Sequence, residues 1–228
     1  MAKKDKNVSG EGLEKIENTL SKTEQFIEKN QKMLMGVMLG ILVVVGGYWA
    51  YMKFVKAPLE KEASSQMFVA EQNFEVDSFK LALNGYQTYP GFVQIAEDYG
   101  STKAGNLANY YAGVSYMNLG EFDKAIEYLG HFKTKDVMLG SIATGLIGDA
   151  YVEKGDYDKA ISYYKKASST NLNDYSTPIY LKKLGLIYEE KGDFKNALTA
   201  YQTIYDNYQK SNEARTIQKY IERAKINI

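Results

Sequence analysis

Side chains able to perform catalysis are scarce in this sequence. Its 228 residues contain one histidine, His131, and no cysteine. A single imidazole cannot build a histidine-rich zinc site or a histidine-based catalytic triad. The lack of thiols removes disulfide frameworks and thiolate metal sites, and it fits either a reducing or an oxidising compartment. We therefore expect His131 to be a surface or loop residue and not a general base.

Motifs that bind phosphate, activate a serine or hold catalytic zinc are also missing. The sequence contains no GxxxxGK[ST], no GxSxG and no HExxH, and its acids are dispersed rather than paired for acid–base work. Basic and acidic residues number 28 each, so no net charge draws the chain toward nucleic acid. The sequence predicts that the protein is not an enzyme and has no metal, no cofactor and no nucleic-acid partner.

One phrase recurs three times, as GEFDKAIEYL at 120–129, GDYDKAISYY at 155–164 and GDFKNALTAY at 192–201. The aligned units are 35 and 37 residues apart. The shared positions are Gly113, Tyr116, Gly120, Phe122, Ala125 and Leu129, then Gly148, Tyr151, Gly155, Tyr157, Ala160 and Tyr164, then Gly185, Tyr188, Gly192, Phe194, Ala197 and Tyr201. This pattern resembles the tetratricopeptide repeat, a helix-turn-helix unit of about 34 residues.

Each repeated residue type has a mechanical role in such a unit. Glycine inside the first helix allows the second helix to pack closely, and the following glycine ends the first helix in a left-handed cap. Acids after that cap favour the start of the second helix, and the alanines sit where the helices cross. The aromatic positions fill the space between helix pairs, so the 20 tyrosines are explained by a core and not by base stacking.

Two further segments extend the repeat array. Upstream, Ala70, Asp77, Phe79, Ala82 and Tyr86 hold similar offsets and predict a degenerate first repeat, followed by a longer loop holding Pro90-Gly91. After Tyr208, the segment SNEARTIQKYIERAKI predicts a polar capping helix, which solenoids need at their ends. The expected fold is all-α, with three clear repeats, one degenerate repeat and a C-terminal capping helix.

One segment departs from this soluble pattern. Residues 33–52 are twenty uncharged residues, long enough at about 1.5 Å per residue to cross a hydrocarbon core of about 30 Å. Tyr48, Trp49 and Tyr51 cluster at its far end, where aromatic rings favour lipid headgroups. A buried core helix and a cleaved signal peptide are the alternatives. The all-round apolar character and the long polar leader favour an uncleaved single-pass anchor in membrane lipid.

The leader, residues 1–32, carries seven lysines, against Lys53, Lys56 and Lys61 just beyond the anchor. The positive-inside rule then places the N-terminus in the cytoplasm and residues 63–228, after a linker at 53–62, on the other side. Apolar residues at near-helical spacing suggest an amphipathic leader helix starting at Ser9 or Gly10. Within the anchor, a face that could dock another membrane helix is formed by Gly36, Gly40 and Gly47.

Tandem arrays of this family bind proteins or peptides on the concave face formed by their first helices. The residues expected there are Tyr110, Val114, Met117, Asn118, Asp149, Val152, Glu153, Lys182, Leu186, Glu189 and Glu190. The family's carboxylate clamp of lysines and asparagines is absent, because only Lys182 is basic and the matching places hold Tyr110, Val114, Gly145 and Asp149. An aromatic and acidic groove suits an extended apolar or basic segment. The alternative is that this face only packs on a neighbour or is shielded.

The order of leader, anchor and array resembles the YfgM-type ancillary subunits of the SecYEG translocon over nearly the whole chain. The stretches DSFKLALNG, STKAGNLANYYAG and IGDAYVEKGDYDKAISYYKKA also resemble a tetratricopeptide family of Bacteroidota-type bacteria. The resemblance implies a bacterial inner-membrane protein with a periplasmic array. Its expected partners are a SecYEG-type translocon, a membrane-anchored periplasmic prolyl isomerase or chaperone, and emerging secretory polypeptides. An adaptor in another envelope complex, for outer-membrane assembly, secretion or motility, is the alternative.

Overall fold

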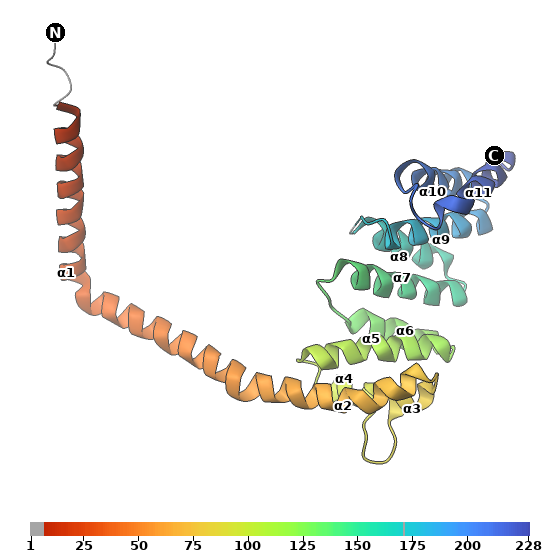
Figure 1. Ribbon diagram of the computed structural model, residues 1–228, viewed down its shortest axis with the longest axis horizontal. Helices are drawn as coiled ribbons and strands as arrows, with labels where there is room; N and C mark the ends of the chain where they lie inside the picture. The colour runs from red at the N-terminus through yellow and green to blue at the C-terminus, as the bar shows by residue number, and fades with distance from the viewer. Residues whose placement is uncertain (1–6, 171) are drawn as a thin grey trace, which may run out of the picture. The chain divides into compact units, whose positions relative to one another are not determined.

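The computed structural model describes the backbone of residues 7–170 and 172–228, and side chains from Glu24 onward. This described part contains helices and no strands, apart from one isolated bridge between Tyr86 and Tyr89. It divides into two compact units, Met1–Pro58 and Leu59–Ile228, which are considered separately below. Figure 1 labels the helices of both units.

The first unit is dominated by α1 (Asn7–Tyr51), which ends in a π-helical turn, η1 (Met52–Lys56). The predicted linker at 53–62 is helical, because η1 leads into α2 (Ala57–Glu75) without a break. The end of α1, η1 and α2 together form one continuous helical stretch, Glu24–Glu75. Among the described residues, this stretch alone contains a segment long and apolar enough to cross a membrane. None of that segment is buried, so it is not a core helix of the described fold.

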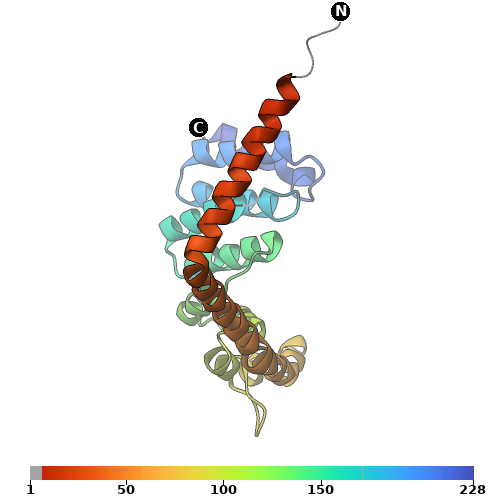
Figure 2. The same cartoon turned by 90° about the vertical axis from the view of Figure 1, so that its left-hand side faces the viewer.

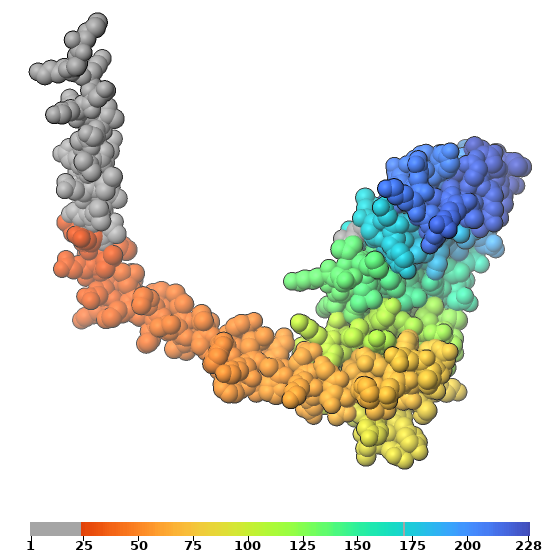
Figure 3. All heavy atoms as spheres, viewed as in Figure 1, coloured from red at the N-terminus to blue at the C-terminus, as the bar shows by residue number. Residues whose placement is uncertain are grey.

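The second unit is a stack of helical hairpins (Figures 1 and 2). The three clear repeats pair α5 (Lys103–Asn118) with α6 (Phe122–His131), α7 (Val137–Glu153) with α8 (Tyr157–Ser169), and α9 (Ser176–Glu190) with α10 (Phe194–Asn207). The predicted repeats are therefore confirmed. In the space-filling view of Figure 3 the hairpins form one continuous body.

Each first helix ends in the glycine cap that the sequence predicts. Gly120 has a φ of +74°, and the Glu121 N–H donates to the Tyr116 carbonyl oxygen at 2.9 Å. The same bonds and the same φ recur at Gly155 and Gly192, so all three turns are Schellman caps. In the degenerate repeat Asp77 takes this place with a φ of +56°, while the Ser78 N–H donates to the Asn73 carbonyl oxygen at 2.8 Å.

The small residues inside the helices lie where large ones pack. A Cβ added to Gly148 would meet the Tyr164 ring at 2.7 Å, and one added to Gly185 would run into the Tyr201 ring. The alanines at the helix crossings are 0% exposed in every clear repeat: Ala125, Ala160 and Ala197. The predicted close packing of each hairpin is therefore confirmed.

The degenerate repeat differs from the prediction in its second helix. Helix α3 (Phe79–Asn84) is short, and α4 (Phe92–Asp98) follows where the sequence predicted only a loop. Tyr86 was expected to fill a core position, but it is 58% exposed in the loop between these helices. Phe92 replaces it in the core, fully buried and stacked on Tyr111 at 5.0 Å. The helix is split because the two short pieces are separated by Gly85 and by Pro90-Gly91, which cannot continue a helix.

The C-terminal cap is present as predicted. Helix α11 (Ala214–Ile226) covers α10 with three buried residues, Ile217, Ile221 and Ala224. Its first turn is capped by Ser211, whose hydroxyl accepts a hydrogen bond from the Ala214 N–H at 3.2 Å. Lysines, glutamates and Arg223 occupy the exposed face, so the last apolar surface of the array is closed.

Candidate peptide-binding groove

The predicted groove residues lie on three consecutive first helices. Helix α7 contacts both α5 and α9, so these three helices lie side by side. All eleven predicted side chains are exposed or half-buried, and none belongs to the buried core. They are Tyr110, Val114, Met117 and Asn118 on α5, Asp149, Val152 and Glu153 on α7, and Lys182, Leu186, Glu189 and Glu190 on α9.

Four of these residues come together in one open cavity of ≈ 630 Å³. Leu186 lines this cavity and is 37% exposed. The predicted members are Val152, Leu186, Glu189 and Glu190, joined by Tyr157, Ile187, Phe194, Arg223 and Asn227. The α5 residues do not line this cavity. Tyr110 instead packs against Phe132 with ring centroids 5.3 Å apart, and burial raises the pKa of Tyr110.

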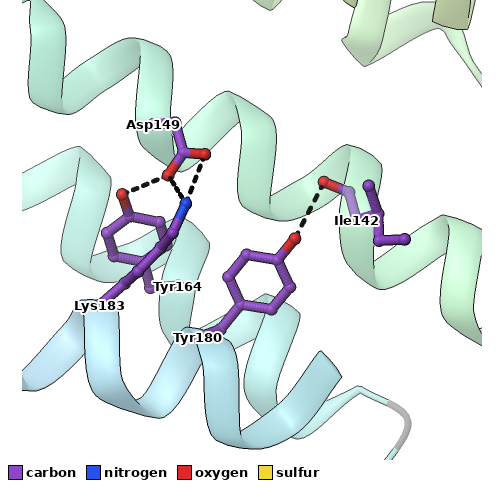
Figure 4. A network of polar contacts seen from close by, with 5 residues as sticks. All are labelled: Ile142, Asp149, Tyr164, Tyr180 and Lys183. Carbon is purple, nitrogen blue, oxygen red and sulfur yellow. Dashed lines mark hydrogen bonds and ion pairs between the residues drawn. The ribbon is translucent and has the colours of Figure 1, made fainter. Parts of the chain in front are cut away.

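Asp149, predicted as an acidic groove residue, is held in a polar network (Figure 4). The Lys183 ammonium donates to both of its carboxylate oxygens at 2.6 and 2.7 Å, and the Tyr164 hydroxyl donates to Oδ1 at 2.6 Å. Burial raises the pKa of Tyr164, and the neighbouring Asp149 charge adds to this effect. The network joins α7, α8 and α9, so Asp149 fastens two repeats together and is not free to bind a ligand.

Tyr180 of α9 also contacts α7. Its hydroxyl faces the Ile142 carbonyl oxygen at 3.4 Å, as drawn in Figure 4. Its ring occupies the space beside Gly145, where an added Cβ would overlap it. Burial, followed by the Asp149 charge, raises the pKa of Tyr180. Glycine at position 145 is therefore required for this contact, which explains why the clamp residue cannot stand there.

Glu189 is paired in the same manner one repeat later. The Arg223 guanidinium of α11 forms an ion pair with the Glu189 carboxylate, whose side chain is only 11% exposed. Burial, followed by the Glu189 charge, raises the pKa of the adjacent Tyr201. Glu189 therefore lines the cavity but is already neutralised by the capping helix.

These pairs reduce the acidic character expected of the aromatic and acidic groove. Asp149 and Glu189 are compensated by Lys183 and Arg223, which leaves Glu153 and Glu190 without ion pairs in the described chain. Lys182 lies over the Tyr220 ring of α11, with its Nζ atom 5.3 Å from the centroid. The groove thus combines apolar side chains with the compensated Glu189–Arg223 pair and with Glu190, an acid that has no ion pair in the described chain.

Lys183, Arg223, Tyr164 and Tyr180 were not predicted as site residues. One signal could have found the two cations, since Asp149–Lys183 and Glu189–Arg223 are both separated by 34 residues. Opposite charges one repeat length apart fall on neighbouring helices of a solenoid. The repeat period had been applied to the glycine, aromatic, alanine and capping acid positions, but not to opposite charges on neighbouring repeats.

The other predicted sites can be placed as follows. Gly36, Gly40 and Gly47 lie in α1, and a Cβ added to any of them would meet nothing within 4 Å. His131 is exposed, as expected, and is the last residue of α6 rather than part of the following loop. Within the described residues no group of three histidines, cysteines or acids could hold a metal ion.

Comparison with known proteins agrees with this architecture. Residues 107–136 and residues 140–210 each match a model of the tetratricopeptide repeat. Two crystal structures of MamA are similar at 20% sequence identity. One covers 70% of this chain and 94% of its own with a TM-score of 0.50, and the other covers 72% and 91% with a TM-score of 0.49. Likeness at this identity shows the fold alone, and no curated protein matches the sequence. From residue 107 to residue 210, the chain is an array of tetratricopeptide repeats.

Proposed function

We propose that this protein is a non-enzymatic scaffold, anchored in a bacterial inner membrane by residues 33–52, whose repeat array binds other proteins in the periplasm. The observation that carries the proposal is the combination of one exposed apolar helix with a repeat array that leaves an open groove lined by both apolar and charged side chains. An apolar stretch of this length is stable in lipid and not in water. A scaffold of this kind requires one surface that enters the membrane and one that binds a protein, and it requires no catalytic group.

The groove geometry narrows the kind of segment it would bind. Leu186 and Val152 offer apolar contacts in the groove, while Glu190 is free to meet a cation. An extended segment with an apolar side chain and a nearby lysine or arginine satisfies both. The paired acids Asp149 and Glu189 add no charge, so binding depends on the apolar contact more than on the acids.

The proposed host complex is a SecYEG-type translocon, with a periplasmic prolyl isomerase or chaperone as neighbour and emerging secretory polypeptides as clients. This proposal rests on the resemblance of the leader, anchor and array to YfgM-type subunits. The uncovered face of Gly36, Gly40 and Gly47 supports it, because small residues allow another membrane helix to approach closely.

The test is gentle detergent extraction of tagged full-length protein from its native membrane, followed by quantitative mass spectrometry. Translocon subunits and a periplasmic isomerase are expected in near-equal amounts. In the variant G36L/G40L these proteins should be lost, because leucine side chains separate the helices. A matched control, M38L/L42I, changes the opposite side of the same helix and should retain them.

Recovery of outer-membrane assembly, secretion or motility proteins in place of the translocon would contradict the translocon proposal. The protein would then be an adaptor in that other envelope complex. If the native partners were the same in G36L/G40L as in the control, the glycine face would not be the contact.

A further inference from the structure

A second cavity, of ≈ 410 Å³, lies on a different part of the array. It is bounded by the end of α6, the loop 132–136, the start of α7 and the end of α8. None of the eleven predicted groove residues lines it. The proposed function of the groove therefore does not say which ligand this cavity would bind.

Three lysines line this cavity against a single acid. Lys133 and Lys135 come from the loop and Lys166 from α8. In the described chain none of their ammonium groups forms an ion pair or a hydrogen bond. Asp136 is the one acid of the described lining, and its Oδ1 already accepts the Leu139 N–H at 2.7 Å as the cap of α7. Three cations against one carboxylate leave the lining with a net positive charge, which favours an anionic ligand.

The loop that carries two of these lysines is held firmly in place. The Asn106 side chain of α5 bonds both backbone groups of Lys133: its Nδ2 donates to the carbonyl oxygen at 2.7 Å, and its Oδ1 accepts the N–H at 2.9 Å. The Thr134 hydroxyl accepts the Asp136 N–H at 3.0 Å. A site whose backbone is fixed before binding loses less entropy when a ligand arrives.

The cavity wall below the lysines is apolar. Leu129, Ala143 and Ile147 contribute to it and are at most 6% exposed. Ser141 lies among them, 3% exposed, and its hydroxyl has no hydrogen-bond partner in the described chain.

We propose that this cavity binds a small organic anion, a carboxylate or a phosphate monoester that carries a short apolar group. The lysines hold the charged end, and the apolar wall receives the other end. A purely inorganic anion would use the lysines alone, and an uncharged apolar molecule would use the wall alone. Only a ligand with both parts matches the whole lining.

The test uses full-length protein in detergent micelles, with ¹³C-labelled isoleucine methyl groups observed by NMR. Phenyl phosphate, benzoate, inorganic phosphate and phenol are titrated in turn. Phenyl phosphate or benzoate should shift the Ile147 methyl signal and leave Ile217, buried under α11, unchanged. The better of the two should bind about tenfold more tightly than inorganic phosphate or phenol, because only it makes both kinds of contact. The comparison of phenyl phosphate with benzoate distinguishes a phosphate from a carboxylate ligand.

A charge-matched pair of variants completes the test. K133Q/K166Q should weaken the better ligand by about tenfold or more, because two charge-assisted contacts are lost. K195Q/K210Q removes the same charge from exposed lysines outside the cavity and should change binding by less than about twofold. Equal weakening in both variants, an unmoved Ile147 signal, or equal affinity for phenyl and inorganic phosphate would each overturn the proposal.

Discussion

At the scale of single residues, two buried tyrosine hydroxyls connect helices and a third is unpartnered. Tyr164 donates to the Asp149 carboxylate and Tyr180 faces a backbone carbonyl of α7, whereas the Tyr201 hydroxyl lies beside Glu189 without a hydrogen-bond partner in the described chain. Burial and a neighbouring carboxylate disfavour the tyrosinate in all three, so each has a raised pKa. The protonation state of these three tyrosines is therefore expected to affect the stability of the array.

The raised tyrosine pKa values predict loss of stability in alkali. Above about pH 10 the unfolded chain releases tyrosine protons that the folded chain retains, so the free energy of unfolding falls as the pH rises. Tyr164→Phe should lower stability by about 1 kcal/mol at pH 8, because one hydrogen bond is lost, yet make the alkaline decline less steep. Thermal unfolding followed by circular dichroism between pH 8 and pH 11 measures both effects.

The control for this prediction is Tyr205→Phe, at a side chain that is 48% exposed. It should leave both the stability at pH 8 and the alkaline decline unchanged. The same steepness in Tyr164→Phe and in the unaltered protein would mean that Tyr164 does not contribute to the decline.

A second prediction at the residue scale concerns backbone conformation. Gly155 and Gly130 are alike in that an added Cβ would meet nothing within 4 Å, but only Gly155 has a positive φ, of +74°. Gly155→Ala should therefore destabilise by about 1 kcal/mol, because alanine is strained in the left-handed region. Gly130→Ala, within α6, should be neutral or stabilising by up to about 1 kcal/mol. Thermal unfolding measures the stability of both variants. Because neither added Cβ meets another atom, a difference between them reports the backbone conformation and not packing. Destabilisation by both variants would contradict the cap explanation.

At the scale of elements, each hairpin depends on a helix crossing too close for a large side chain. Ala160 is 0% exposed at such a crossing in the second clear repeat. Ala160→Leu should overpack it and lower the free energy of unfolding by about 1–3 kcal/mol. Ser162→Leu, on the exposed side of the same helix, is the matched control and should change stability by less than about 0.5 kcal/mol. Unchanged unfolding of Ala160→Leu would show that the assumed crossing is wrong.

The helices of the three clear repeats can be predicted from the sequence because their capping residues recur at the repeat spacing. Gly120, Gly155 and Gly192 are needed by their own turns, so they can be recognised without knowing any distant contact. Helix α4 could not be predicted in this way, because a seven-residue segment after Pro90-Gly91 carries too little periodicity to distinguish a helix from a loop. Its core residue, Phe92, is explained only by its contact with Tyr111.

The candidate groove was predicted less completely than the fold. The family pattern located residues on the first helices, and they range from half-buried to exposed. It could not tell that Lys183 and Arg223 would neutralise Asp149 and Glu189, because that pairing depends on how adjacent helices are rotated. Charge in the groove is therefore a property of neighbouring repeats and not of any single helix.

At the scale of the whole molecule, the array is closed at its C-terminal end by α11. Ile217→Asp would place a charge at a fully buried position and should release α11 from the array. We expect amide hydrogen exchange to accelerate in α9, α10 and α11 but to stay unchanged in α5 and α6, because each repeat contacts only its neighbours. Hydrogen exchange followed by mass spectrometry measures this, with the exposed change Gln218→Asp as control. Uniform acceleration through all helices would mean that the array unfolds as one cooperative unit.

The opposite end of the array has a different character. Its first repeat turns on Asp77 in the left-handed region where the other repeats use glycine, and its second helix is interrupted by the exposed loop that holds Tyr86 and Tyr89 (Figure 1). A non-glycine cap and a broken helix both reduce local stability. Limited proteolysis should therefore cut first within residues 85–91. In a cell, this loop would be where quality-control proteases first engage the array, so the lifetime of the protein would depend on its least regular repeat.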